Sequence, residues 1–171
     1  PYVLDSNRCI SYLTIELKRV IPVEYRKAIG NRIYGCDDCQ IVCPWNSHAV
    51  TTDDPDFQKK QDTLNLIDLI QITGEMFSRR FKGSPIKRIK RRGLLRNVAV
   101  ALGNSGNSQA IPPLLKVLDD EEPLIRAHAV WALGELSGIE ILPAIREKLN
   151  NEKEDIVLAE LARVVTRFAT P

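Results

Sequence analysis

Apolar residues in the second half of the chain recur at helical spacing, and the pattern itself repeats. Residues 97–120 can be laid over residues 128–151 with an offset of 31, which superimposes Gly103 on Gly134. Each copy has the pattern of a helix, a short turn and a second helix, and a third, degenerate copy begins near Ile156. Because one such pair cannot bury its apolar face alone, we predict a stack of helical pairs.

These repeats resemble the short HEAT-like unit, a relative of the armadillo repeat. Trp131 and Phe168 have positions in the repeat pattern that predict core residues rather than ligand platforms. His128 lies on a predicted repeat helix and is interpreted as structural. His48 follows a cysteine-rich loop, and the sequence leaves its role open.

Upstream of the repeats the pattern predicts three further helices. The segment "DTLNLIDLIQITGEMFSRRF" has the pattern of two short helices broken near Thr73 and Gly74. Ser84 can cap a third helix, which is expected over residues 85–102 and to stop at Gly103. The apolar positions expected to be buried in these helices are Leu66, Leu69, Ile70, Phe77, Phe81, Ile86, Ile89, Leu94, Val98, Ala101 and Leu102.

Charge is distributed unevenly around this third helix. The formal net charge is only +2, but there is no acidic residue between Glu75 and Asp119. A solvated helix face normally alternates in sign, and like charges on neighbouring helical positions repel. A phosphate-rich partner would offset that repulsion, so nucleic acid is favoured over a merely solvated face. The basic residues of the stretch are Arg79, Arg80, Lys82, Lys87, Arg88, Lys90, Arg91, Arg92 and Arg96.

Three of the four cysteines are crowded into "GCDDCQIVCPWN", and the fourth is Cys9. No secretory signal is visible and the spacings are short, so disulfides are disfavoured and metal binding is favoured. The run C-x2-C-x3-C-P, from Cys36 through Cys39 to Cys43, is typical of the end of a bacterial ferredoxin motif, whose last cysteine ligates a second cluster. A structural zinc site is the alternative. Two four-iron clusters need eight thiolates, so we expect the missing ligands upstream of Pro1.

Three blocks together, "CISYLTIE" at 9–16, "GNRIYGCDDCQIVCPWN" at 30–46 and "FKGSPIKRIKRRGLLRNVAVALGN" at 81–104, resemble the epoxyqueuosine reductase family. The resemblance implies a mainly α chain: a partial ferredoxin-like [4Fe-4S] module over residues 1–56, a basic helical linker over 57–95 and HEAT-like helical repeats over 96–171. It also implies reduction of epoxyqueuosine to queuosine at the wobble position of tRNA. The family's cobalamin-binding catalytic domain has no counterpart here, so the fragment alone is expected to be inactive.

The same resemblance assigns residues. Cys9, Cys36 and Cys39 would hold one cluster with a cysteine from the missing segment, and Cys43 would complete the other. Ser11 and Asp37 are candidate contacts to cobalamin. Lys18 and the basic stretch from Arg79 to Arg92, without Arg96, would bind the anticodon stem-loop of tRNA, and Arg19 beside Lys18 would add a phosphate contact.

Further expectations concern partners and rival functions. The resemblance implies an electron donor, and the chain is expected to be a cytoplasmic monomer. The sequence contains no run of 18 apolar residues, so no membrane span is predicted. A HEAT-repeat adaptor with a structural zinc site is one alternative, and a ferredoxin-type electron carrier fused to repeats is another. Reductive dehalogenases also combine cobalamin with two clusters, but they offer no reason for the basic helix.

Overall fold

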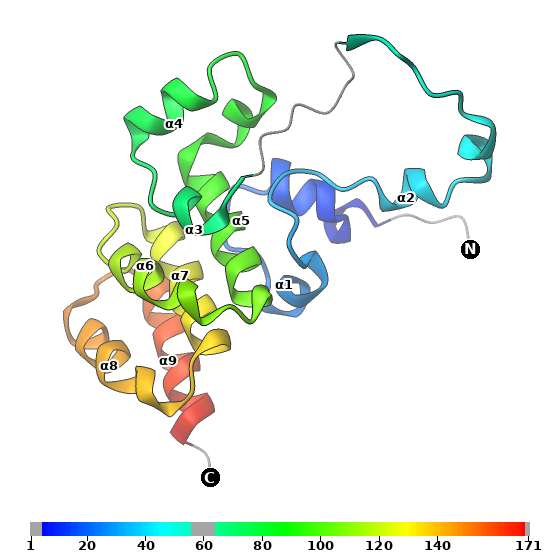
Figure 1. The fold of residues 1–171 in the computed structure, drawn as a ribbon. Coiled ribbons are helices and arrows are strands. Elements are labelled where there is room, and N and C mark those ends of the chain that lie inside the picture. The colour runs from blue at the N-terminus through cyan, green and yellow to red at the C-terminus, as the bar shows by residue number, and fades with distance from the viewer. Residues whose placement is uncertain (1–4, 56–63, 170–171) are drawn as a thin grey trace.

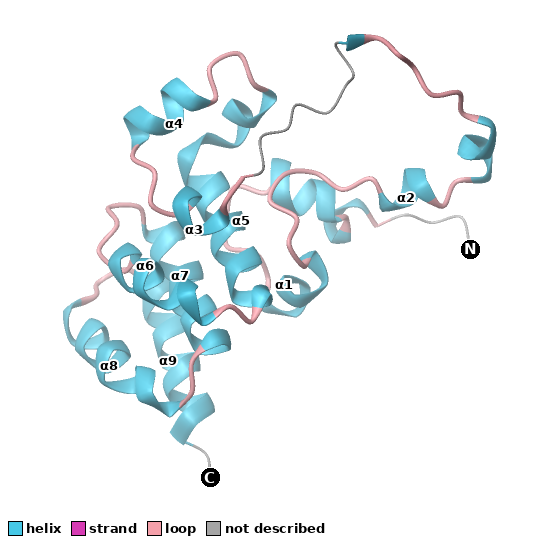
Figure 2. Ribbon diagram, viewed as in Figure 1, coloured by secondary structure: helices cyan, strands magenta, loops and turns pink. Residues whose placement is uncertain are grey.

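The computed structural model describes residues 5–55 and 64–169, and regular structure in these ranges is helical throughout (Figure 2). The expectation of a mainly α fold is therefore confirmed. None of the helices in these ranges combines the length and the apolar character needed to cross a membrane.

The C-terminal half is a stack of helical pairs, as predicted. In Figure 1, α5, α7 and α9 lie side by side, and the shorter helices α6 and α8 cover them. The repeat offset of 31 residues makes α5 equivalent to α7 and α6 equivalent to α8. These helices are α5 (Lys90–Ser105), α6 (Ile111–Val117), α7 (Pro123–Leu136), α8 (Leu142–Asn151) and α9 (Asp155–Ala169), with the short 3₁₀ turns η6 (Ser108–Ala110) and η7 (Ile139–Ile141) between members of a pair.

Equivalent glycines explain why the repeats pack so closely. A Cβ added at Gly103 would lie 2.6 Å from the Trp131 ring and 2.9 Å from the Cα of Ala132 on α7. A Cβ added at Gly134 would lie 2.8 Å from Val164 on α9. The helix axes can approach only because both positions lack a side chain. The repeated glycine in the sequence is thus a packing contact between successive repeats.

The N-terminal segment packs against α5 and also reaches α7 and α9, since the Ile21 N–H donates to His128 and Arg26 pairs with Glu160. It contains a 3₁₀ turn, η1 (Ser6–Arg8), a π-helical turn, η2 (Tyr12–Glu16), and α1 (Val23–Ile29). Its buried side chains join the same apolar core as the repeats. Covered on both sides, α5 is buried from Gly93 to Gly103, including the polar side chains of Arg96 and Asn97. The three-part division of the chain stays a prediction.

The cysteine loop after residue 35 extends away from this body (Figure 1). It contains the short helix α2 (Asp38–Ile41) and the 3₁₀ turn η3 (Pro44–His48), neither of which has a buried residue. The end of η3 places His48 on an exposed surface.

Residues 64–89 form two short helices and a 3₁₀ turn: α3 (Leu66–Leu69), α4 (Gly74–Arg80) and η5 (Pro85–Ile89). The predicted break is confirmed, since the hydroxyl of Thr73 accepts from the Met76 N–H at the start of α4. Ser84 caps η5 through Ile86, as expected.

The prediction of one continuous helix over 85–102 is wrong. Its first turn is 3₁₀, and Lys90 follows with φ +58°, so α5 begins there on a different axis. The helix also continues past Gly103, which is needed for packing, and ends before Gly106 at φ +66°. Gly106, rather than Gly103, therefore provides the left-handed residue that ends the helix.

The structural interpretation of His128 is confirmed. It is fully buried, its Nδ1–H donates to the Leu124 carbonyl at 2.8 Å, and its Nε2 accepts from the Ile21 N–H at 3.1 Å. Burial, with the nearby charge of Arg26, holds its pKa well below the ordinary value. Trp131 is buried and Phe168 half-buried against the core, again as predicted.

Candidate functional site

The four cysteines lie on two segments that are adjacent to the body of the protein. Cys9 follows η1, and its backbone carbonyl accepts from the Leu13 N–H at the start of η2. Cys36 follows Gly35, whose φ of +78° turns the chain outward into the loop. Cys39 lies on α2, and Cys43 precedes η3. All four are free thiols, with Cys39 exposed and the others half-buried.

Two neighbouring residues of α5 fasten both cysteine-bearing segments to the repeats. Asn97 donates through Nδ2 to the carbonyls of Thr14 and Ile33, each at 2.8 Å. Arg96 donates to the carbonyls of Leu13, Leu17 and Arg19 at 2.6 to 3.0 Å. These bonds are made between groups more than 60 positions apart in sequence, so they fix tertiary structure rather than a local turn.

Arg96 works from inside the core, with 1% of its surface exposed. Burial, and then the positive charge of Arg92, lower its pKa to about 10, so the guanidinium stays protonated at neutral pH. A buried guanidinium is tolerable only when its donors are satisfied. Three backbone carbonyls and the Asn97 side-chain oxygen satisfy them.

Thr14 joins the two cysteine-bearing segments directly. Its hydroxyl donates to the Ile10 carbonyl at 2.8 Å and accepts from the Gly35 N–H at 3.0 Å. Ile10 is next to Cys9, and Gly35 is next to Cys36. A single buried threonine therefore sets the spacing between the starts of the two ligand segments.

A charged pair lies beside the Cys36 thiol. Arg32 donates to both oxygens of Asp38 at 2.7 Å. The hydrogen bond and charge of Asp38, followed by the charge of Cys36, raise the pKa of Arg32.

The described residues fit part of a cluster site rather than a complete one. In residues 5–55 and 64–169, no three His, Cys, Asp or Glu side chains converge as metal ligands. The loop that carries Cys39 and Cys43 also exposes large apolar side chains at Ile41, Trp45 and Val50, by 77%, 91% and 93%. Free thiols at ferredoxin spacing, beside uncovered apolar side chains, are the chemistry expected of a site completed by further polypeptide.

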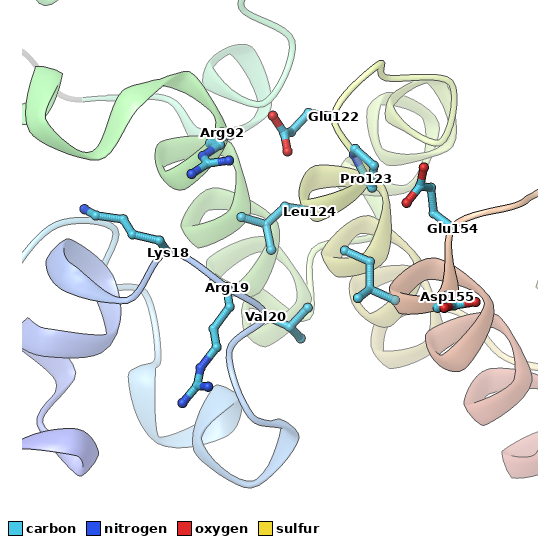
Figure 3. Close-up of a pocket in the computed structure, with 10 residues that line it drawn as sticks. Lys18, Arg19, Val20, Arg92, Glu122, Pro123, Leu124, Glu154 and Asp155 are labelled. Atoms are coloured by element: carbon cyan, nitrogen blue, oxygen red, sulfur yellow. The ribbon is translucent and has the colours of Figure 1, made fainter.

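The basic residues lie on α4, on η5 and at the start of α5. Lys87, Arg88 and Lys90 are exposed, and so are Arg79, Arg80 and Lys82. Lys18 is exposed after η2, while Arg92 is half-buried at the rim of a cleft that it shares with Lys18 (Figure 3). The structure thus brings Lys18 and Arg92 together, although they are 74 positions apart in sequence.

Arg91 is not part of this free basic surface. Its Nε donates to the Ile72 carbonyl at 2.8 Å, and its guanidinium pairs with both oxygens of Asp120. Only 20% of the side chain is exposed. We therefore read Arg91 as a brace between α5 and the turn after α6, and we leave it out of the candidate nucleic-acid interface.

The two candidate cobalamin contacts lie on the ligand segments. Ser11 is half-buried just before η2, where its backbone carbonyl accepts from the Thr14 hydroxyl at 3.3 Å. Asp37 is exposed just before α2, and its carbonyl accepts from the Ile41 N–H. Their role toward cobalamin stays a prediction.

Sequence reasoning missed the polar residues that position the ligand segments. Asn97 and Thr14 were not singled out, nor was the buried pair of Arg26 with Glu160, at 2.6 Å, which joins α1 to α9. The signal for Asn97 is that Arg96 and Asn97 are adjacent polar residues within the apolar stretch from Leu94 to Leu102 of α5.

Comparison with known proteins agrees with this arrangement. The family described as "4Fe-4S double cluster binding domain" matches residues 1–46, and that of HEAT repeats matches residues 92–166. Epoxyqueuosine reductase of Salmonella typhimurium is 47% identical over 137 residues, covering 79% of this chain and 36% of that protein. The Yersinia pestis protein of the same name is 42% identical over 155 residues, covering 90% and 38%.

Solved structures give the same result. A crystal structure of epoxyqueuosine reductase with an epoxyqueuosine-modified stem loop of tRNA-Tyr matches with a TM-score of 0.90 at 29% identity. The match covers 99% of this chain and 46% of that one. The Bacillus subtilis enzyme matches with a TM-score of 0.89 at 30% identity, covering 97% and 45%. The chain thus spans under half the length of each of these relatives.

Proposed function

We propose that this chain, which belongs to the epoxyqueuosine reductase family, supplies cluster ligands and an RNA-binding surface to an enzyme that reduces epoxyqueuosine to queuosine at the wobble position of tRNA. Identity of 42% and 47% over most of the chain, across both the cysteine blocks and the repeats, supports the family's reaction for the whole protein. The activity would need the rest of the relatives' length, which includes the family's catalytic domain.

The observation that carries this proposal is direct contact between the basic turn η5 and both cysteine-bearing segments. Arg88 of η5 forms an ion pair with Glu16 of η2 at 2.6 Å. The Tyr34 hydroxyl, two residues before Cys36, donates to the Pro85 carbonyl at 3.0 Å. An RNA held on η5 would therefore lie beside the segments that carry the ligands.

We infer that Cys9, Cys36 and Cys39 hold one [4Fe-4S] cluster with a fourth thiolate from outside this chain. Cys43, which Pro44 follows, would be a ligand of the second cluster. When bound, such clusters supply single electrons at potentials set by hydrogen bonds and burial around their sulfurs. The hydrogen bonds of Thr14 and Asn97 would hold Cys9 and Cys36 at a fixed separation, and Arg32 would keep positive charge near Cys36.

Cobalamin belongs to the proposal only through the family. The group would supply the two-electron chemistry at the epoxide. Ser11 and Asp37 are retained as candidate contacts because they neighbour ligand cysteines, and no further role is derived for them.

The RNA-binding part of the proposal rests on the exposed cations. Lys87 and Arg88 on η5, with Lys18 beside η2, would neutralise phosphates of the anticodon stem-loop. Each such contact releases a counterion, so removing one should weaken binding for all sequences alike and lower the salt slope by about one.

Alanine substitutions test this surface with internal controls. Lys87→Ala should weaken binding of a tRNA-Tyr stem-loop and reduce its salt dependence. Lys116→Ala removes an equally exposed lysine on α6 and should change neither. Arg91→Ala should lower thermal stability instead, because its side chain braces Asp120. Equal binding losses at Lys87 and Lys116 would refute a localised interface.

The reaction itself is tested with the intact protein and a stem-loop that carries epoxyqueuosine. Conversion to queuosine with a chemical reductant is expected, and Cys36→Ser should abolish it while RNA binding persists. A colourless, zinc-containing protein that binds the stem-loop without converting it would instead favour the adaptor alternative.

A further inference from the structure

An ion pair encloses Cys36, the first cysteine of the C-x2-C-x3-C-P run. Arg32 lies four positions before this cysteine and Asp38 two positions after it. The Nη2 of Arg32 donates to both carboxylate oxygens of Asp38, each at 2.7 Å. Asp38 is the first residue of α2, the helix that carries Cys39. The pair therefore joins the segment before Cys36 to the helix that follows it, and closes the chain around the thiol.

Cys36 lies within electrostatic reach of both partners. The pKa of Arg32 is raised mainly by the hydrogen bond and charge of Asp38, and Cys36 raises it further. The pKa of Asp38 is lowered mainly by the hydrogen bond from Arg32, and a hydrogen bond from Cys36 lowers it further. Any group bound to this sulfur would therefore lie beside one cation and one carboxylate.

Arg32 is the last cation before the cysteine loop. In the sequence, no lysine or arginine follows it until Lys59. Arg8 precedes another candidate ligand, Cys9, but its guanidinium lies over the Tyr25 ring, 5.9 Å from the centroid. Arg32 is therefore the arginine best placed to hold positive charge beside the Cys36 sulfur.

The guanidinium of Arg32 also retains hydrogen-bond donors. Its Nη2 serves Asp38, and its Nη1 lies 3.5 Å from the Ile29 carbonyl. Within the described part of the chain, these bonds leave Nε–H and one N–H of Nη1 for other acceptors. The side chain is 34% exposed, so it can still approach a group that binds at Cys36. Hydrogen bonds to the sulfurs and the net charge nearby help to set the potential of an iron–sulfur cluster.

We propose that Arg32 and Asp38 set the reduction potential of the cluster that Cys36 ligates, through charges of opposite sign. This inference rests on the proposed function, since it needs the cluster. Reduction adds one electron to the cluster and neither forms nor breaks a bond. The added negative charge is stabilised by the Arg32 cation and destabilised by the Asp38 carboxylate. Removing either charge alone should therefore move the potential, and the two shifts should have opposite signs.

Charge-neutralising variants of the intact protein test these signs. Arg32→Gln should lower the midpoint potential of one cluster and Asp38→Asn should raise it, each by about 30–60 mV, which is a three- to tenfold change in the equilibrium constant of a one-electron couple. The midpoint of the other cluster should stay nearly constant and serves as an internal reference. Lys27→Gln is the matched control, because Lys27 is an exposed cation of α1 whose partner, Glu135, lies on α7. Midpoints are measured by electron paramagnetic resonance of samples poised at a series of potentials.

Arg32→Lys separates the charge from the shape of the side chain. It keeps the positive charge, so its midpoint should stay close to that of the wild type even where iron per chain falls. A pair that only fastens the loop would lower iron equally in Arg32→Gln and Asp38→Asn, with unchanged midpoints or with shifts of one sign, and either result would overturn the proposal. If Arg32→Gln holds no cluster, Asp38→Asn decides alone, because only a raised midpoint agrees with the proposal. A wild type without iron would instead contradict the proposed function, which is a distinct result.

Discussion

Asn97 is the side chain whose removal should separate cluster binding from folding most cleanly. It is fully buried on α5, and its Nδ2 donates to the carbonyls of Thr14 and Ile33, one on each of the two cysteine-bearing segments. Asn97→Ala leaves the buried Thr14 carbonyl and the part-buried Ile33 carbonyl without that donor. The change should loosen the Cys9 and Cys36 segments together.

The expected cost follows from those two bonds. Leaving a buried polar group unsatisfied costs about 1–3 kcal/mol, so two carbonyls cost about 2–6 kcal/mol of unfolding free energy. Domains of this kind are stable by about 5–15 kcal/mol, so the variant should still fold at room temperature. A folded variant is what makes the test informative.

Asn104→Ala is the matched control. Asn104 is on the same helix and also donates to two carbonyls, those of Arg26 and Gly30, at 2.8 and 3.0 Å. Both variants should unfold at a lower midpoint concentration of urea, as measured by far-ultraviolet circular dichroism. In the intact protein only Asn97→Ala should also lower iron per chain, because Asn104 supports α1 rather than a ligand segment. Equal iron content in the two variants would refute the idea that α5 positions the ligand cysteines.

Three further outcomes are expected. Because burial lowers the pKa of His128 in the folded protein, the unfolded chain binds one more proton below pH 6.5. The free energy of unfolding should therefore fall by up to about 1.4 kcal/mol per pH unit as the pH drops from 6.5 to 5. Urea titrations should show this slope in His48→Gln and not in His128→Gln. Gly103→Ala should lower the melting temperature by several degrees, since its Cβ would overlap both an indole ring and backbone of α7, whereas Gly74→Ala, with open space around it, should be neutral or slightly stabilising. Arg91→Met, which removes the positive charge, should lower the melting temperature without altering the salt dependence of RNA binding. A reduced salt dependence would show that Arg91 contacts the RNA.

Features set by local rules could be predicted from the sequence. The repeat offset located the pairs of helices because each copy must present an apolar stripe to the next. Ser84 acts as a cap and the chain breaks at Thr73 as expected, since caps and breaks depend on a few neighbouring residues. The candidate ligands could likewise be predicted, because the cysteine spacing is a local motif and the family resemblance rests on contiguous blocks of sequence.

Features set by distant backbone could not be predicted. In the sequence Arg96 is one more cation in a basic run, but its partners are main-chain carbonyls 77 to 83 positions away. Because every residue has a main-chain carbonyl, such partners cannot be recognised from residue types in the sequence. The pairing of Arg91 could not be predicted either, because its partner, Asp120, lies beyond the acid-free stretch. The bend at Lys90 was missed because a lysine at positive φ carries no signal in the sequence.

The most direct test measures the cluster content of the intact protein and of two variants, each of which lacks one cysteine thiol from a different half of the site. Iron analysis and electron paramagnetic resonance of the reduced protein should show two [4Fe-4S] clusters in the wild type. Cys9→Ser and Cys43→Ser should each lose one cluster, and the signals that remain should differ between the two variants. An iron-free wild type, or loss of the same cluster from both variants, would contradict the account.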